Sequence, residues 1–161
     1  MKTIVHPKKR GEWVELQFMA RAAHHGLTVS KPWGDTARYD FIVEHGGRFQ
    51  RVQVKSTTMF ATVRPGRTRS AYLCNTVSRG PTVKTPGRSY LATEIDFFAF
   101  YIIPEDVWYI VPIADVRRAR FAVYLNPYQR HNKYFRFMEA WHLFTMCGAA
   151  RQNPARYVSG G

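Results

Sequence analysis

The spacing of apolar residues predicts a helix followed by a hairpin in the first third of the chain. Apolar side chains recur at helical spacing from about residue 10 to residue 25, and a short strand is expected at 27–30. Residues 39–56 then alternate apolar and polar positions on either side of Gly46 and Gly47. Two adjacent glycines supply the positive φ angles of a tight two-residue turn, so this stretch predicts an antiparallel hairpin.

Apolar and aromatic residues dominate the second half of the chain. Residues 94–103 form a nearly continuous apolar run, which is typical of a strand buried on both faces, and residues 107–111 return beside it. Shorter strands are expected at 59–63, 71–74 and 121–125. Residues 134–147 carry aromatic side chains at helical spacing and predict a closing helix. The order of elements predicts an α/β fold with a mixed central sheet flanked by helices.

The length of 161 residues is about that of one domain. We expect a single domain over residues 1–147. Within it, residues 64–88 are dense in Gly, Pro, Ser, Thr and Arg, and apart from the strand expected at 71–74 most of this segment is predicted to be a long exposed basic loop. Residues 148–161 are rich in Gly, Ala and Arg, and we expect a disordered tail there.

The charge of the chain indicates a polyanionic partner. Lys and Arg number 24 against 11 Asp and Glu, which gives a formal net charge of +13. A basic surface of this kind gains affinity for nucleic acid by releasing condensed counterions. No apolar run approaches 18 residues and no secretory signal is visible, so no membrane association is expected. Cys74 and Cys147 lack metal-ligand or redox spacing, which favours a reducing, cytoplasmic location.

The predicted hairpin gathers polar groups on one face. With a two-residue turn at Gly46 and Gly47, the numbers of paired residues sum to 93, so Asp40 lies opposite Gln53. Lys55 points to the same face, because side chains alternate along a strand. The hairpin therefore presents a carboxylate, an amide oxygen and an ammonium group together. Glu15, on the edge of the apolar stripe of the first helix, can add a second carboxylate.

These groups suit a hydrolase that uses Mg²⁺. Such an enzyme needs hard oxygen ligands for the ion and a cation to offset the charge that develops on the reacting phosphate. Each residue also has a simpler interpretation. An acid near a helix start complements the helix dipole, and alternating Arg51, Gln53 and Lys55 can be the solvated face of a strand. Residue patterns alone leave both interpretations open.

The same residues resemble the PD-(D/E)XK nuclease superfamily. Tyr39-Asp40 stands at the position of the family's Pro-Asp pair, and Gln53-Val54-Lys55 stands at the position of its (D/E)-x-Lys motif. The more specific resemblance is to group I intron-associated homing endonucleases, and it covers most of residues 10–147. The shared segments are Gly11 to Glu15 (GxxxE), RYD ending at Asp40, RVQVK at 51–55, IDFFAFY at 95–101 and YIVP at 109–112.

The resemblance implies a fold, an activity and roles for the residues. The fold is a restriction-endonuclease-like core, and the activity is Mg²⁺-dependent hydrolysis of phosphodiester bonds in double-stranded DNA, with Mn²⁺ expected to substitute. Asp40 would bind the metal with the Gln53 oxygen and the Val54 carbonyl, while Glu15 would bind the ion directly or through water. Lys55 would orient the attacking water. A homodimer or homotetramer is implied, with the aromatic C-terminal helix as the natural interface.

Two other functions fit the same sequence. One is a Holliday junction resolvase-like, structure-specific nuclease, against which Gln53 counts because such enzymes keep an acid there. The other is a catalytically inactive DNA-binding module, against which the retention of Glu15, Asp40 and Lys55 counts. The expected DNA contacts are the basic residues of the loop: Arg64, Arg67, Arg69, Arg79, Lys84 and Arg88.

Asp96, inside an apolar strand, is expected to be structural. A buried carboxylate in such a strand needs a partner, and Arg38, Arg51 or Tyr90 can supply one.

Overall fold

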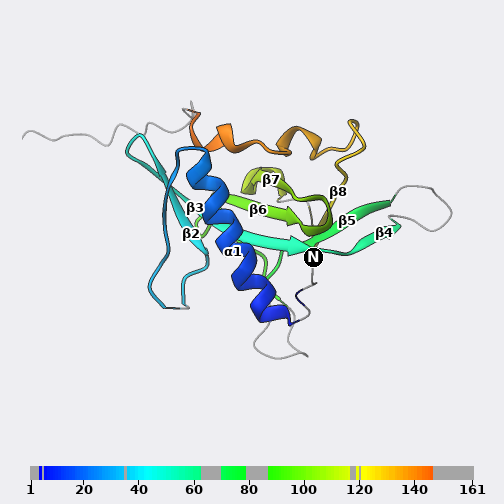
Figure 1. Cartoon of the computed structure of the whole chain (residues 1–161), viewed down its shortest axis with the longest axis horizontal. Helices are drawn as coiled ribbons and strands as arrows, with labels where there is room; N and C mark the ends of the chain where they lie inside the picture. The colour runs from blue at the N-terminus through cyan, green and yellow to red at the C-terminus, as the bar shows by residue number, and fades with distance from the viewer. Residues whose placement is uncertain are drawn as a thin grey trace, which may run out of the picture.

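The computed structural model describes residues 4, 6–34, 36–62, 70–78, 87–116, 119 and 121–146. Within these residues the chain forms one long helix, a five-stranded sheet, a three-stranded sheet and several short helical turns (Figure 1). The helices are α1 (Pro7–His24) and α2 (Ile113–Val116), with 3₁₀ turns η1 (Ile103–Glu105), η2 (Phe135–Phe137) and η3 (Trp141–Phe144). The predicted tail at 148–161 lies outside the described residues.

The N-terminal helix α1 begins where the sequence carries a helix-start signal. Pro7 occupies the first turn, where its missing N–H is no loss, and the His6 side chain accepts a hydrogen bond from the backbone N of Lys9 at 3.5 Å. Val14, Phe18 and Ala22 recur every four residues and are buried. This apolar stripe holds α1 diagonally across one face of the larger sheet, as Figure 1 shows.

The hairpin of β2 (Phe41–His45) and β3 (Arg48–Thr57) has the predicted register. His45 pairs with Arg48 and Ile42 pairs with Arg51, which confirms the two-residue turn at Gly46 and Gly47. Both glycines have positive φ angles, of 58° and 75°, as such a turn requires. Four apolar residues of the hairpin are buried in the core: Phe41, Val43, Val52 and Val54.

The larger sheet is mixed, which confirms the predicted architecture. Its strand order is β1-β2-β3-β6-β7, where β1 is Thr28–Ser30, β6 is Phe97–Ile102 and β7 is Val107–Pro112. Strands β3 and β6 are parallel, whereas the other neighbours are antiparallel. From the second residue of β6 onward every side chain is at most 3% exposed, because both faces of this strand are covered.

Each face of the larger sheet is covered by a separate group of apolar side chains. On the first face, α1 and η3 pack against β2, β3, β6 and β7 around Phe18, Trp108 and Trp141. On the second face, a smaller sheet of β4 (Phe60–Thr62), β5 (Ser70–Asn75) and β8 (Ala122–Leu125) packs against Phe98, Phe100 and other residues of β6 and β7. The strand predicted at 71–74 is thus the centre of this second sheet.

The prediction of a helix at 134–147 is wrong. In place of a helix, the chain makes the two 3₁₀ turns η2 and η3, with Glu139 between them in the left-handed region at φ 49°. The Glu139 carboxylate accepts hydrogen bonds from the backbone N of Trp108 at 2.7 Å and from Nε1 of Trp141 at 2.8 Å. These two hydrogen bonds stabilise Glu139 in the left-handed region, a conformation that a continuous α-helix cannot contain.

The same segment closes the protein's own core. Phe137, Trp141 and Phe144 are each at most 5% exposed. Because these side chains are buried inside the fold, they do not form the exposed aromatic helix face that was expected to serve as the oligomer interface.

Asp96 pairs with Arg51, one of its three expected partners. The carboxylate accepts from the backbone N of Arg51 at 2.8 Å, from Nε at 3.0 Å and from Nη2 at 2.9 Å. We expect Asp96→Ala to lower the free energy of unfolding by about 1–2 kcal/mol, because two guanidinium donors and one backbone donor lose their acceptor. Asp115→Ala breaks a more exposed pair with Arg136 and should cost about 0.5 kcal/mol or less. Urea unfolding of both variants measures the difference, and equal costs would contradict this account.

Candidate active site

The site lies in a notch at the edge of β3, just beyond the point where β2 stops pairing with it. The backbone N of Asp40, the residue before β2, donates to the Val52 carbonyl of β3 at 2.9 Å. The Asp40 carboxylate then replaces the missing strand, because its Oδ2 accepts from the backbone N of Val54 at 2.7 Å. The carboxylate is thereby fixed against the backbone of β3.

Gln53 lies beside Asp40, as the hairpin register predicts. Its side chain is buried, and its Nε2 donates to Asp40 Oδ2 at 2.5 Å and to the Val54 carbonyl at 3.3 Å. The prediction had the amide oxygen turned toward Asp40, whereas here the nitrogen faces it. The Asp40 and Val54 oxygens, which are expected to bind the metal, thus both accept hydrogen bonds from the Gln53 amide nitrogen. Gln53 can contribute its own oxygen only after its amide turns over.

Glu15 reaches the notch from α1. It lines a cleft of about 370 Å³ together with Val54 and Lys55, between the first half of α1, the end of β3 and β5. Lys31, which follows β1, donates to Glu15 at 2.6 Å, and this hydrogen bond raises the pKa of Lys31. Sequence reasoning missed Lys31, because a single lysine after a short edge strand carries no motif.

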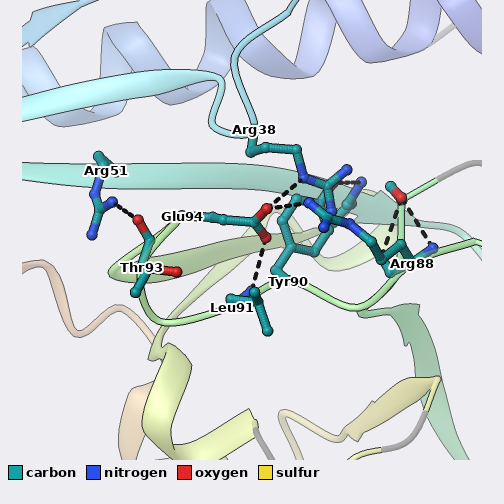
Figure 2. A network of polar contacts seen from close by, with 9 residues as sticks. Arg38, Arg51, Arg88, Tyr90, Leu91, Thr93 and Glu94 are labelled. Carbon is teal, nitrogen blue, oxygen red and sulfur yellow. Dashed lines mark hydrogen bonds and ion pairs between the residues drawn. The ribbon is translucent and has the colours of Figure 1, made fainter.

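Lys55 also contacts a second set of residues, which come from the segments before β2 and β6. Its Nζ donates to the Tyr90 hydroxyl at 3.2 Å and lies 5.3 Å from the centre of the Tyr90 ring. The guanidinium carbon of Arg38 lies 4.4 Å from the centre of the same ring. Figure 2 shows the Arg38 and Tyr90 side chains together, with Glu94 and Arg88 beside them. Sequence reasoning considered Arg38 and Tyr90 only as partners of Asp96.

The electrostatics of the notch favour binding of a cation. The pKa of Asp40 is raised to about 6: burial and the nearby carboxylate of Glu15 raise it, and the Val54 N–H, Lys55 and Gln53 offset part of that rise. Both hydrogen bonds to the carboxylate fall on Oδ2, so Oδ1 accepts none from the described part of the chain. A cation placed beside Oδ1 would offset the cost of an ionised, buried carboxylate next to a second one.

The donor atoms of the notch fit a hard divalent cation. Carboxylates of Asp40 and Glu15, the Val54 carbonyl and the Gln53 amide oxygen are the ligand types that Mg²⁺ takes, with water and substrate oxygens filling the remaining positions. Among the described residues no cluster of three or more His, Cys, Asp and Glu side chains forms a metal site. A site here would therefore depend on backbone, amide and substrate oxygens as well as carboxylates.

The structure describes one of the six expected DNA-binding residues. Arg88 forms an ion pair with Glu94, and its backbone N donates to Ser78 Oγ at 3.2 Å. The other five lie outside the described residues: Arg64, Arg67, Arg69, Arg79 and Lys84. In the part of the chain that the structure describes, no helix is both long and apolar enough to span a membrane.

The mixed sheet and the acidic notch at β3 are features of a nuclease fold, and comparison with known proteins identifies the same class. The family model described as PD-(D/E)XK endonuclease matches residues 5–144. The chain belongs to this family, and it is a nuclease. Among solved structures it is similar to the bacterial homing endonuclease I-Ssp6803I, with 25% sequence identity and a TM-score of 0.69 over 85% of this chain and 91% of the other. Comparison with curated proteins gave no match.

Proposed function

We propose that this chain is a Mg²⁺-dependent endonuclease of the homing type that hydrolyses phosphodiester bonds in double-stranded DNA. The observation that carries the proposal is the notch at β3, where the Asp40 carboxylate and the Val54 carbonyl converge within the same site as Glu15 and Lys55. The similarity to a bacterial homing endonuclease supports the assignment of substrate.

Each residue has a distinct role in this proposal. Asp40, Val54 and, after its amide turns, Gln53 would hold Mg²⁺, and Glu15 would hold it directly or through a water. The ion would supply Lewis-acid catalysis and a more acidic bound water, and Mn²⁺ should replace it. Lys55 would orient the attacking water and offset negative charge on the phosphate as the bond breaks.

The charge of the chain supports DNA as the partner. The net charge of +13 gives it affinity for a polyanion, and Arg10 adds a positive group to the cleft beside Glu15. One such site can cut one strand at a time. We therefore propose that two or four copies act together on a duplex, in a symmetric assembly that light scattering after gel filtration would measure.

Cleavage of a pool of duplexes tests the proposed function. Purified protein is incubated with random-sequence linear duplexes and, in parallel, with a four-way junction, in Mg²⁺, Mn²⁺ or EDTA. We expect cuts at discrete duplex sequences in either metal and none in EDTA. Cleavage confined to the junction would replace this proposal with the resolvase type. Binding to duplex DNA without any cleavage, across a pool that covers all short sequences, would indicate an inactive DNA-binding module.

A further inference from the structure

The segment before β6 brings Tyr90 to the catalytic side of β3. Tyr90 is far from the hairpin in sequence, yet its hydroxyl accepts a hydrogen bond from Lys55 Nζ at 3.2 Å. Lys55 has a further interaction besides this one. Within the described residues, Lys55 is the hydrogen-bond partner of the Tyr90 hydroxyl. A tyrosine that served packing alone would direct its hydroxyl to solvent or to a backbone carbonyl.

The Tyr90 ring is held from several sides. The ring of Phe98, buried in β6, meets it edge to face with the centres 5.3 Å apart. Arg38 stacks on it at 4.4 Å, and Nε of Arg38 lies 3.5 Å from Glu94 Oε1 (Figure 2). Nη2 of Arg38 is buried and has no hydrogen-bond partner among the described residues. The cation–π contact with the Tyr90 ring therefore contributes much of the stabilisation of this guanidinium.

Glu94 connects the segment that carries Tyr90 with two arginine side chains. Its carboxylate accepts a hydrogen bond from the backbone N of Leu91 at 3.0 Å and pairs with both Arg38 and Arg88. The Leu91 bond and the two guanidinium groups keep the pKa of Glu94 below its usual value. Glu94 therefore stays ionised and fixes the segment that carries Tyr90.

We propose that Tyr90 is a positioning residue that orients the Lys55 ammonium group in the active site. An ammonium group has three N–H donors. One of them is directed to the Tyr90 oxygen, which restricts the rotation of the group and thereby limits the directions of the other two. Burial raises the pKa of Tyr90 to about 12, so the hydroxyl remains neutral and interacts with Lys55 through a hydrogen bond and not through an ion pair.

Tyr90→Phe isolates the hydroxyl from the ring. Phenylalanine keeps the contacts with Phe98 and Arg38 and removes only the acceptor for Lys55. We expect kcat for DNA cleavage to fall about tenfold, since a hydrogen bond to a charged group is lost, while KM changes less than twofold. Tyr128→Phe is the matched control, because the Tyr128 hydroxyl hydrogen-bonds to Glu105 and has no contact with Lys55; its kcat should equal that of the wild type.

A second readout does not depend on turnover, whereas the kcat readout rests on the proposed function. The rate at which an amine-reactive reagent labels Lys55 is measured by mass spectrometry, with Lys31 as the internal reference. Loss of the Tyr90 acceptor should raise the Lys55 rate at least threefold, because Nζ is no longer held against the Tyr90 hydroxyl and becomes more accessible to the reagent. Labelling equal to that of the wild type would overturn the inference, as would an unchanged kcat or an equal rise in KM. If the wild type cuts no DNA, the proposed function fails, and the labelling rate alone decides the role of Tyr90.

Discussion

Asp40→Asn is expected to reduce Mg²⁺-dependent cleavage by at least about 100-fold, because a neutral amide binds the cation far more weakly than a carboxylate. Asparagine has the same size, and its oxygen can still accept the hydrogen bonds from Val54 N and Gln53 Nε2. The loss should therefore come from the metal site and not from misfolding. Asp115→Asn, at a surface ion pair with Arg136, is the matched control and should cleave at the rate of the wild type.

The same substitution should stabilise the metal-free protein. The pKa of Asp40 is raised from 3.8 to about 6, so the folded state binds protons more tightly than the unfolded state. The associated free energy is fully present below about pH 4 and is lost as the pH rises to about 6, by at most about 3 kcal/mol. Asp40→Asn has no such loss. In EDTA at pH 8 it should therefore unfold at higher urea concentration than the wild type.

The pH dependence of these quantities separates the metal-site account from its alternatives. At limiting Mg²⁺, cleavage by the wild type should fall as the pH drops below about 6, because protonated Asp40 cannot hold the ion. Added Mg²⁺ should restore stability to the wild type at pH 8 and leave Asp40→Asn unchanged. Near wild-type cleavage by Asp40→Asn would refute the proposed metal site. A variant less stable than the wild type at pH 8 would refute the electrostatic cost assigned to Asp40.

Lys55→Met is expected to lower kcat by about 100-fold or more while DNA affinity changes less than about tenfold, since the ammonium group acts mainly on the charge of the reacting phosphate. Methionine retains much of the aliphatic stem of Lys55 and removes the ammonium group, with its charge and its hydrogen bond to Tyr90. Lys133→Met is the matched control, because Lys133 contacts Asp115 and Tyr134 and does not line the cleft.

The two effects are measured in separate assays. Binding of a duplex in EDTA reports affinity without turnover, and single-turnover cleavage in Mg²⁺ reports the chemical step. If Lys55→Met lost affinity and rate to the same extent, the lysine would be a DNA contact and not a catalytic group. Lys55→Arg keeps the positive charge but replaces a compact ammonium with a planar group, and we expect it to recover only part of the rate.

Local rules were sufficient for the hairpin and for part of the site. The two-residue turn at Gly46 and Gly47 sets the pairing, and the period of two along a strand then places Asp40 beside Gln53, as observed. The long apolar run at 94–103 predicted a strand covered on both faces, and β6 is such a strand. These features depend on residues close in sequence, whose geometry the backbone dictates.

The C-terminal segment shows where local rules failed. Aromatic residues at 137, 141 and 144 have helical spacing, yet 3₁₀ turns with a left-handed residue between them satisfy the same spacing. The choice depended on Glu139, whose carboxylate bonds to the backbone of β7 and to Trp141. Nothing in the segment itself encodes the position of that strand.

By itself, the sequence determined the hairpin, the α/β class, the basic charge and the group formed by Asp40, Gln53 and Lys55. Only the tertiary structure decided that β3 pairs in parallel with β6, and that β2 stops short and leaves a notch for a carboxylate. It also brought Lys31 to Glu15 and Tyr90 to Lys55. These pairs join segments far apart in the chain, so their contact follows from the packing of whole elements and not from any local preference of the backbone.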